Sequence, residues 1–353
     1  MLALKGSNFM YRLDTAVWEI TLKCNIKCIH CGSSADFNKR PKELDTEGAL
    51  DLVEQLADLG CKRVVLSGGE PFLRKDWAII AMRIKDLGMR VSFISNGYLV
   101  DKDVIDLLKI IEPSGISFSL DGSNEKTHDF IRGKKGVFKR CLNALRETSN
   151  LGLYSSAVTS VHKLNKDELE GILDILLECG VCAWQIQIAT PQGRMSKDLT
   201  LNEEEYYELC EFIAKNREKY QNLINIVEAD CIGYYSILSE KFEQKVWHGC
   251  QAGLRVIGIE SDGSIKGCLS IHGDEFIEGN IKNQSLKDIW NSKDNFKYNR
   301  RFKIEDLKGI CKDCKYGAVC RAGCSEKALS FTGSIFSSPY CLYNTELKKG
   351  IQQ

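Results

Sequence analysis

The sequence predicts an α/β fold of parallel βαβ units, followed by a smaller cysteine-rich region. Over the first two hundred residues, six strand-like apolar runs alternate with amphipathic stretches of helical period. This alternation is the pattern of parallel strands joined by crossover helices. Beyond about residue 245, short strands, Gly-rich turns and clustered cysteines replace it. We therefore expect a domain boundary near residue 245.

Each element follows from a local pattern. The six predicted strands are Ala16–Thr21, Val64–Ser67, Val91–Ser95, Ile116–Leu120, Tyr154–Val161 and Trp184–Ala189. The predicted helices between them are Thr46–Leu59, Trp77–Leu87, Lys102–Ile111, Val137–Thr148 and Lys166–Glu178. The pattern then predicts a helix over Leu201–Tyr220, a strand over Leu223–Ala229 and a helix over Asp230–Lys245. Val256–Glu260 and Ile265–Cys268 flank a Gly-containing turn and predict a small hairpin.

Composition excludes several classes of protein. The 48 basic and 48 acidic residues balance, so no long-range attraction to nucleic acid or an anionic membrane is expected. No apolar run approaches the roughly 20 residues that span a bilayer, and residues 1–10 lack the apolar core of a signal peptide. Sixteen cysteines without an export signal predict metal binding or catalysis, not disulfides. We expect a cytoplasmic protein that binds neither nucleic acid nor membrane.

The strongest chemical signal follows the first predicted strand. Cys24, Cys28 and Cys31 are spaced C-x3-C-x2-C, and three thiols so close together suit one inorganic core. A cubane iron–sulfur cluster normally takes four thiolates, so three would leave one iron open to a small molecule. A zinc loop is the alternative, but structural zinc prefers four ligands in C-x2-4-C pairs. The spacing therefore favours a catalytic cluster.

This spacing resembles the signature of the radical SAM superfamily. The resemblance implies a partial (β/α)6 TIM-type barrel, open on one side, with its chemistry at the C-terminal ends of the strands. It also implies that the open iron binds the amino and carboxylate groups of S-adenosylmethionine. One electron from the cluster would then cleave the sulfonium, giving methionine and a 5′-deoxyadenosyl radical that abstracts hydrogen.

The second predicted strand ends in Gly68-Gly69-Glu70, where the two glycines let the backbone approach a ligand closely. This segment resembles the family's GGE motif, which binds the methionyl amine of S-adenosylmethionine. A tight βα turn is the alternative when the motif is taken alone.

Other strand ends supply further candidate contacts. The resemblance places Ser95, Asn96 and Ser119 near the ribose and the methionyl carboxylate, although Asn-Gly and Asp-Gly pairs are also common in turns. Arg132 is a candidate second partner for the carboxylate, because Arg pairs well with carboxylates; a solvated Arg is the alternative. His30 stands where the family usually has an aromatic residue, so we expect it to pack near the adenine. Gln187, on the sixth strand, is a candidate adenine contact.

The C-terminal cysteines form a second pattern. They run Cys250-x12-Gly263-x4-Cys268, then Cys311-x2-Cys314-x5-Cys320-x3-Cys324, then Cys341. A zinc knuckle at the C-x2-C pair is the alternative, but seven cysteines do not divide into four-ligand zinc sites. The series resembles the seven-cysteine SPASM extension of radical SAM enzymes, and every spacing fits that pattern.

This resemblance implies two auxiliary [4Fe-4S] clusters, and so three clusters in all, one of them binding S-adenosylmethionine. One auxiliary cluster would take Cys311, Cys314, Cys320 and Cys341. The other would take Cys250, Cys268 and Cys324, either with an open site, which we favour, or with Cys231 as a fourth ligand. The implied domains are an extension (1–14), the partial barrel (15–200), bridging helices (201–247) and the SPASM domain (248–353). Cys179 and Cys182 lie between a helix and a strand, and we interpret them as structural.

The resemblance predicts an enzyme that crosslinks or oxidises side chains of a ribosomally made peptide. Leu269 and His30 both depart from the pattern of sulfatase maturases and argue against that branch. With about 15 residues before the first strand, a leader peptide would be held by the barrel or by a separate protein. A reductant such as flavodoxin or ferredoxin would supply the electron.

Two other functions stay open. One is a radical SAM oxidoreductase of a small molecule, such as an aminocyclitol or a tetrapyrrole. The other is a non-catalytic electron carrier, which the amine-binding motif argues against. No catalytic acid or base is predicted, because Asp230, His272 and Asp274 near the cluster region are typical of surface polar residues.

Overall fold

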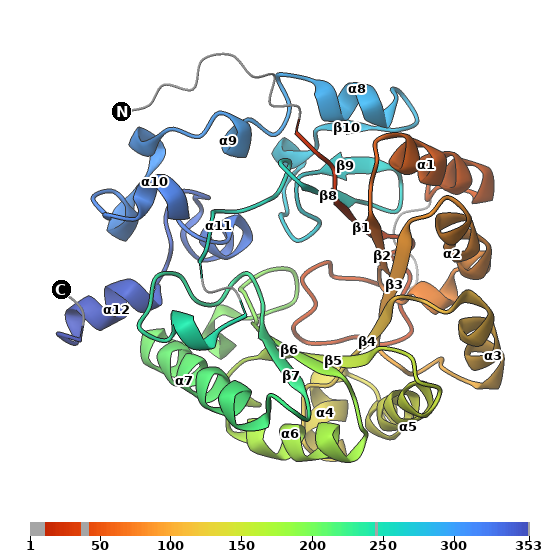
Figure 1. The fold of residues 1–353 in the computed structure, drawn as a ribbon, viewed down its shortest axis with the longest axis horizontal. Coiled ribbons are helices and arrows are strands. Elements are labelled where there is room, and N and C mark those ends of the chain that lie inside the picture. Colours follow the sequence, from red (N-terminus) through yellow and green to blue (C-terminus); the bar gives the residue numbers. More distant parts are fainter. Residues whose placement is uncertain (1–10, 37–41, 244–245, 352–353) are drawn as a thin grey trace.

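A computed structural model describes residues 11–36, 42–243 and 246–351, so parts of the predicted 1–14 segment and of the predicted helix at 230–245 lie outside the described residues. Ten strands form one curved sheet in the order β10-β9-β8-β1-β2-β3-β4-β5-β6-β7, with helices around its outer side (Figure 1). The strands are β1 (Thr15–Glu19), β2 (Arg63–Ser67), β3 (Arg90–Ser95), β4 (Gly115–Ser119), β5 (Ser155–Val161), β6 (Ala183–Ile188), β7 (Asn225–Glu228), β8 (Val256–Ile259), β9 (Ser264–Lys266) and β10 (Gly279–Asn280).

The predicted α/β architecture is confirmed. Strands β1 to β7 pair in parallel in chain order, and within the described residues the sheet ends at β7 and β10 without closing into a barrel. The six predicted strands all form. The additional strand predicted over 223–229 also forms, as β7, so the partial barrel has a seventh parallel strand.

Six of the helices follow the predicted periodicity. The helices are α1 (Thr46–Asp58), α2 (Trp77–Asp86), α3 (Lys102–Ile111), α4 (Glu125–Arg132), α5 (Val137–Asn150), α6 (Leu169–Glu178), α7 (Glu203–Tyr220), α8 (Leu286–Asn291), α9 (Lys297–Arg300), α10 (Gly317–Cys320), α11 (Ser325–Thr332) and α12 (Leu342–Lys348). Helices α4 and α8–α12 were not predicted. The predicted helix at 230–245 is wrong: residues 230–243 form turns and one short 3-10 segment, Ser239–Lys241. Tyr234 and Tyr235 have φ angles of 81° and 54° there, which no α-helix accommodates.

The cysteine-rich region is joined to the barrel through the sheet. The predicted hairpin forms as β8 and β9, which pair antiparallel, and β8 also pairs in parallel with β1. The predicted boundary near residue 245 therefore falls between strands of one continuous sheet.

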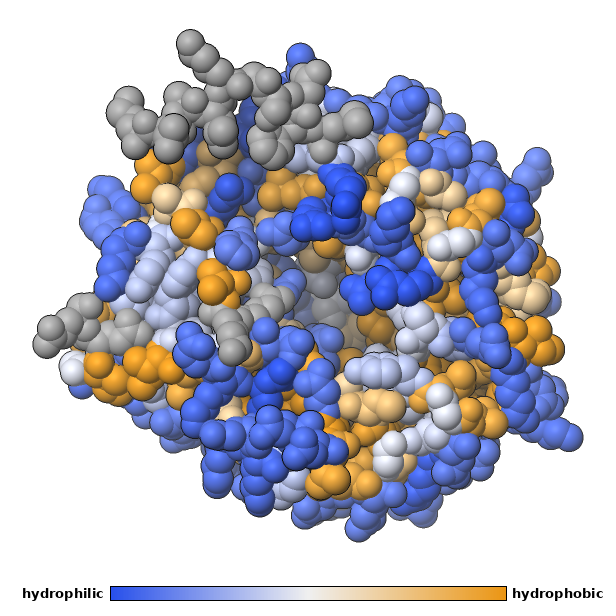
Figure 2. Space-filling model, in the orientation of Figure 1, coloured by the Kyte–Doolittle hydropathy of each residue, from blue (hydrophilic) through white to orange (hydrophobic). Residues whose placement is uncertain are grey.

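The two faces of the parallel strands differ in polarity. Side chains that face the helices, such as Trp18, Phe93 and Trp184, are fully or almost fully buried in one apolar core. On the opposite face, Gln185 is exposed and Ser117 is half-buried, whereas closed barrels fill this space with bulky branched residues. Figure 2 shows the molecule hollowed near the centre of this view. No helix in the described part of the chain is long and apolar enough to cross a membrane.

Candidate metal and cofactor site

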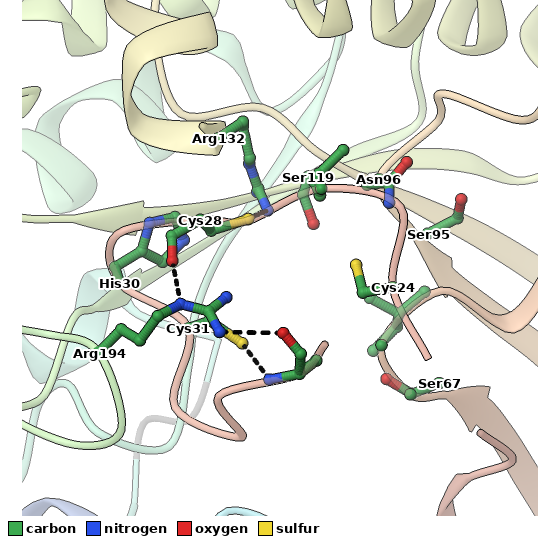
Figure 3. A pocket seen from close by; sticks show the side chains of 15 residues that line it. Cys24, Cys28, His30, Cys31, Ser67, Ser95, Asn96, Ser119, Arg132 and Arg194 are labelled. Atoms are coloured by element: carbon green, nitrogen blue, oxygen red, sulfur yellow. Dashed lines mark hydrogen bonds between the residues drawn. The ribbon is translucent and has the colours of Figure 1, made fainter. Parts of the chain in front are cut away.

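The loop after β1 brings its three cysteines to one cavity. Cys24, Cys28 and Cys31 line a cavity of about 140 Å³ at the C-terminal ends of the strands (Figure 3). Burial raises the pKa of the Cys24 thiol to about 12, so without a bound cation this site would hold neutral thiols. A metal deprotonates the thiols that coordinate it. The donor set therefore fits an iron–sulfur cluster held by three thiolates.

The two glycines after β2 let the cysteine loop pack against the sheet. A Cβ atom on Gly68 would lie 2.2 Å from the carbonyl oxygen of Thr21, and one on Gly69 would lie 2.2 Å from that of Lys23. Both distances are far shorter than a van der Waals contact. Gly68 and Gly69 line the cavity, so their close approach positions the segment that leads directly into Cys24.

Glu70 lies in a buried hydrogen-bond network next to the cavity. Its carboxylate accepts hydrogen bonds from the Ser95 hydroxyl at 2.8 Å and from the Asn96 backbone N–H at 2.9 Å. Burial raises the pKa of Glu70 to about 7. Ser95, Asn96 and Ser119 line the cavity itself, as drawn in Figure 3. The structure thus brings four predicted contacts from three strand ends to one place.

Arg132, at the end of α4, is buried and not solvated. Its Nη2 lies 2.6 Å from Oδ2 of Asp121, and its Nη1 donates to Cys28 Sγ at 3.6 Å. Its Nε is buried without a hydrogen-bond partner in the described structure. Burial acts to raise the pKa of Asp121, but the Arg132 guanidinium outweighs it and holds this pKa below its usual value. A positive charge therefore stands beside one cysteine of the loop, which suits an anionic cluster.

His30 lies between this ion pair and the cavity. Its Nε2 is 3.4 Å from Asp121 Oδ2, and its ring centroid is 5.6 Å from that of His162. Burial lowers the pKa of His30 to about 4, so the imidazole is neutral at pH 7. A neutral ring in this place is compatible with the predicted packing beside a cofactor.

Arg194 is a residue that the sequence did not reveal. It follows β6, and its Nε donates to the Cys28 carbonyl at 2.8 Å while Nη1 donates to the Ala35 carbonyl at 2.9 Å (Figure 3). It lines the cavity between these two contacts. Arg194 thus joins the middle of the cysteine loop to the segment that follows it, although it is more than 150 residues away in the sequence.

A second, larger cavity adjoins the first. It has a volume of about 380 Å³ and is lined by His30, Cys31 and Arg132 from the barrel and by Leu269, His272 and Glu326 from the cysteine-rich region. Gln187 lines this second cavity and donates to Ser160 at 2.8 Å. His272, expected to be a surface residue, is half-buried in the wall of this cavity.

The SPASM-like cysteines divide into the two predicted sets. Cys311, Cys314, Cys320 and Cys341 line one cavity of about 390 Å³, near α10 and α12. Four thiols around one cavity fit a fully ligated cluster. No three His, Cys, Asp or Glu side chains in the described residues are close enough together to hold a single metal ion. The four thiols that line this cavity are spaced for a larger group, such as a cluster.

The remaining three cysteines lie near one another. Burial raises the pKa of the Cys268 thiol to about 12, and the neighbouring Cys250 raises it further. Burial likewise raises the pKa of Cys324, with added contributions from Glu326, Cys250 and Cys231. Cys231 also lines the second cavity. It stays the candidate fourth thiol, beside the alternative of an open site.

Comparison with known proteins identifies the family. The model of the radical SAM superfamily matches residues 18–176, and that of an iron–sulfur cluster-binding domain, SPASM, matches residues 250–315. The chain therefore carries a radical SAM domain followed by a SPASM domain. This radical SAM/SPASM protein is an enzyme whose cofactors are S-adenosylmethionine and iron–sulfur clusters.

Relatives of this radical SAM/SPASM protein carry more than one activity. It is 29% identical to an AdoMet-dependent heme synthase of Methanosarcina barkeri, over 92% of this chain and 95% of that protein. It is 27% identical to the mycofactocin maturase MftC of Mycolicibacterium smegmatis, over 91% and 80%. The crystal structure of Streptococcus suis SuiB has the same fold, with a TM-score of 0.75 at 16% identity over 94% of this chain and 77% of that chain.

Proposed function

We propose that this enzyme uses a 5′-deoxyadenosyl radical to oxidise or crosslink side chains of a ribosomally made peptide, which binds in the second cavity. The observation that carries the proposal is the position of this cavity. It runs from the three-cysteine loop to Glu326, which follows Cys324 by two residues. A substrate there would lie between the site of radical generation and the auxiliary cysteines.

The cysteines that hold the clusters are assigned in three sets. The loop cysteines Cys24, Cys28 and Cys31 hold the cluster that binds S-adenosylmethionine. The auxiliary clusters are held by Cys311, Cys314, Cys320 and Cys341 and by Cys250, Cys268 and Cys324. When bound, the first cluster and S-adenosylmethionine supply the radical that abstracts hydrogen. The grouping of each set around one site supports this assignment.

The protein's own side chains hold this site rigid. Arg194 fixes the cysteine loop at two carbonyls, and Arg132 holds Cys28 from the other side. Ser95 and Asn96 form the wall where the amine and ribose of S-adenosylmethionine are proposed to bind, and Glu70 lies behind them and accepts a hydrogen bond from each. Gln187, which lines the second cavity, is the proposed adenine contact.

The charge of the second cavity favours a peptide over a polyanion. Glu326 is largely buried, and Thr190 and Ser330 donate hydrogen bonds to its Oε1 at 2.6 Å and 2.8 Å. Of the described residues that line this cavity, Arg132 alone carries a permanent positive charge, and Asp121 neutralises it. Peptide N–H groups and ammonium groups suit such a wall, whereas carboxylates do not.

A tetrapyrrole is the second candidate substrate, because the heme synthase of Methanosarcina barkeri is 29% identical to this chain. Tetrapyrroles with propionate side chains would need cationic partners. The second cavity offers few, and we therefore place this candidate second.

Radical formation is tested without knowing the substrate. The chain is reconstituted anaerobically with iron and sulfide, reduced and given S-adenosylmethionine, and 5′-deoxyadenosine is measured by mass spectrometry. Cys28→Ala should abolish the product, whereas Cys182→Ala, at an exposed thiol, should retain it. Absence of product from the fully loaded parent protein would favour the electron-carrier alternative.

The substrate class is tested by comparing two probes in separate incubations. Short peptides encoded next to this gene and an iron porphyrin with propionate side chains are each incubated with the reduced enzyme, and mass changes are recorded. We expect a peptide to change mass and to stimulate 5′-deoxyadenosine formation. Glu326→Gln should raise the KM for that peptide while retaining the acceptor for Thr190 and Ser330. A mass change confined to the porphyrin would reverse the order of the two candidates.

A further inference from the structure

Lys327 is a fully buried lysine on α11, three residues after Cys324. Its side chain is 0% exposed, and no ion pair joins it to a carboxylate within the described residues. Its one hydrogen-bond acceptor is the Tyr340 carbonyl, 3.4 Å from Nζ. The Glu326 carboxylate interacts with this charge but forms no ion pair with it. Burying an ammonium without a paired counter-charge is costly, so this position favours a further anion nearby.

Three tyrosine rings surround the Lys327 ammonium. Nζ lies 4.9 Å from the ring centroid of Tyr206, 4.8 Å from that of Tyr234 and 5.8 Å from that of Tyr340. Each ring face attracts a cation. This attraction holds the ammonium in place but does not replace its lost hydration.

The tyrosine cage connects the two auxiliary cysteine sets. The Tyr234 hydroxyl accepts the backbone N–H of Cys324 at 2.9 Å. Tyr340 directly precedes Cys341, and the Tyr206 and Tyr340 rings lie 4.9 Å apart. The ammonium therefore lies beside residues that position one cysteine of each set.

We propose that Lys327 is a fixed positive charge that raises the reduction potentials of the auxiliary clusters. This inference rests on the proposed function, in which the seven C-terminal cysteines hold these two clusters. A cubane with thiolate ligands is an anion, and reduction adds one more negative charge. A nearby cation favours the reduced form, because the net charge and surroundings of a cluster set its potential. A higher potential makes the auxiliary clusters better acceptors of an electron from an oxidised substrate.

The test measures the potential of the auxiliary clusters in isolation. Cys24, Cys28 and Cys31 are all replaced by Ala, so that the auxiliary clusters are the ones left to observe. The reconstituted protein is titrated with reductant under electron paramagnetic resonance. Lys327→Met removes the charge but keeps a long apolar stem, and it should shift the midpoint potentials to more negative values.

Two matched variants separate charge from packing. Lys327→Arg keeps the charge and should restore potentials close to those of the parent. Lys287→Met removes an exposed lysine on α8 and should leave them unchanged, because water screens that charge. Equal midpoint potentials in the parent and in Lys327→Met, at equal iron content, would overturn the proposal.

Iron content distinguishes this inference from the proposed function. The parent of the series should bind about eight iron atoms, four for each cubane; a parent without iron would overturn both. If Lys327→Met takes up no iron while Lys327→Arg does, the positive charge is needed for cluster assembly and not for tuning the potential, and the proposal is overturned. If neither variant takes up iron, the packing of the lysine side chain and not its charge is what the clusters require, and the proposal is overturned.

Discussion

Replacing Asp121 by Asn should destabilise the protein by leaving a buried guanidinium without a counter-charge. The side chains of Arg132 and Asp121 are 9% and 0% exposed, and their closest atoms are 2.6 Å apart. Removing one partner of such a pair typically costs about 3–5 kcal/mol. Asn can still accept the Ser160 backbone N–H that Asp121 accepts at 2.8 Å. We therefore expect a loss near the lower end, about 3 kcal/mol in the free energy of unfolding.

The measurement is equilibrium unfolding in urea, followed by tryptophan fluorescence on the iron-free chain. Asp121→Asn, Arg132→Met and the double variant form a thermodynamic cycle. The free energy of unfolding of the double variant should fall by much less than the sum of the two single decreases, because neither charge of the pair remains buried. Asp106→Asn breaks the exposed pair with Lys109 and should leave stability unchanged. An additive cycle, or an Asp121→Asn variant as stable as the parent, would refute the reasoning.

Three further predictions follow from local geometry. Gly69→Ala should prevent loading of the first cluster and lower the iron content by about a third, whereas Gly115→Ala, whose nearest contact would be 3.5 Å, should load normally. Glu168→Gln should cost about 1 kcal/mol at pH 7: burial acts to raise the pKa of Glu168, but hydrogen bonds from Thr127 and Ser123 outweigh it and hold the pKa below its usual value. The stabilisation by the Glu168 carboxylate is present above the unfolded pKa of about 4.3 and is lost as the pH falls through the folded pKa. The free energies of unfolding of parent and variant, measured in urea titrations, should therefore converge below about pH 4. Chelation of iron should lower the melting temperature measured by circular dichroism, because cluster binding stabilises the folded chain.

The sequence predicted the sheet and the cysteine sets because both depend on local spacing. Alternating periods of strand and helix are visible in windows of a few residues, and all seven parallel strands were located. Helix α4 was missed because Glu125–Arg132 is short and mostly polar. The helix predicted at 230–245 fails where Tyr234 turns to place its ring beside Lys327 and its hydroxyl on Cys324.

Residues that hold the site through tertiary contacts could not be found in this way. Arg194 approaches the cysteine loop from the far end of the sheet, and Glu326 reaches the second cavity from α11. Asp121 was visible in an Asp-Gly turn but gave no sign that it would bind Arg132. Arg, Asp and Glu are mostly exposed in folded proteins, so the sequence alone does not show which of them is paired or buried. That becomes visible only in the folded chain.

The position of the SPASM domain on the sheet bears on how the enzyme controls its radical. Strand β8 pairs with β1 from Thr15 to Trp18, and β1 leads directly into the cysteine loop. The hairpin of β8 and β9 in turn leads into Cys268 and the wall of the second cavity at Leu269. The barrel wall and the SPASM wall of the cavity are thus joined by backbone hydrogen bonds of one sheet and not by a flexible linker. A radical enzyme gains from this arrangement, because a substrate held between rigid walls presents one hydrogen to abstraction at a fixed distance.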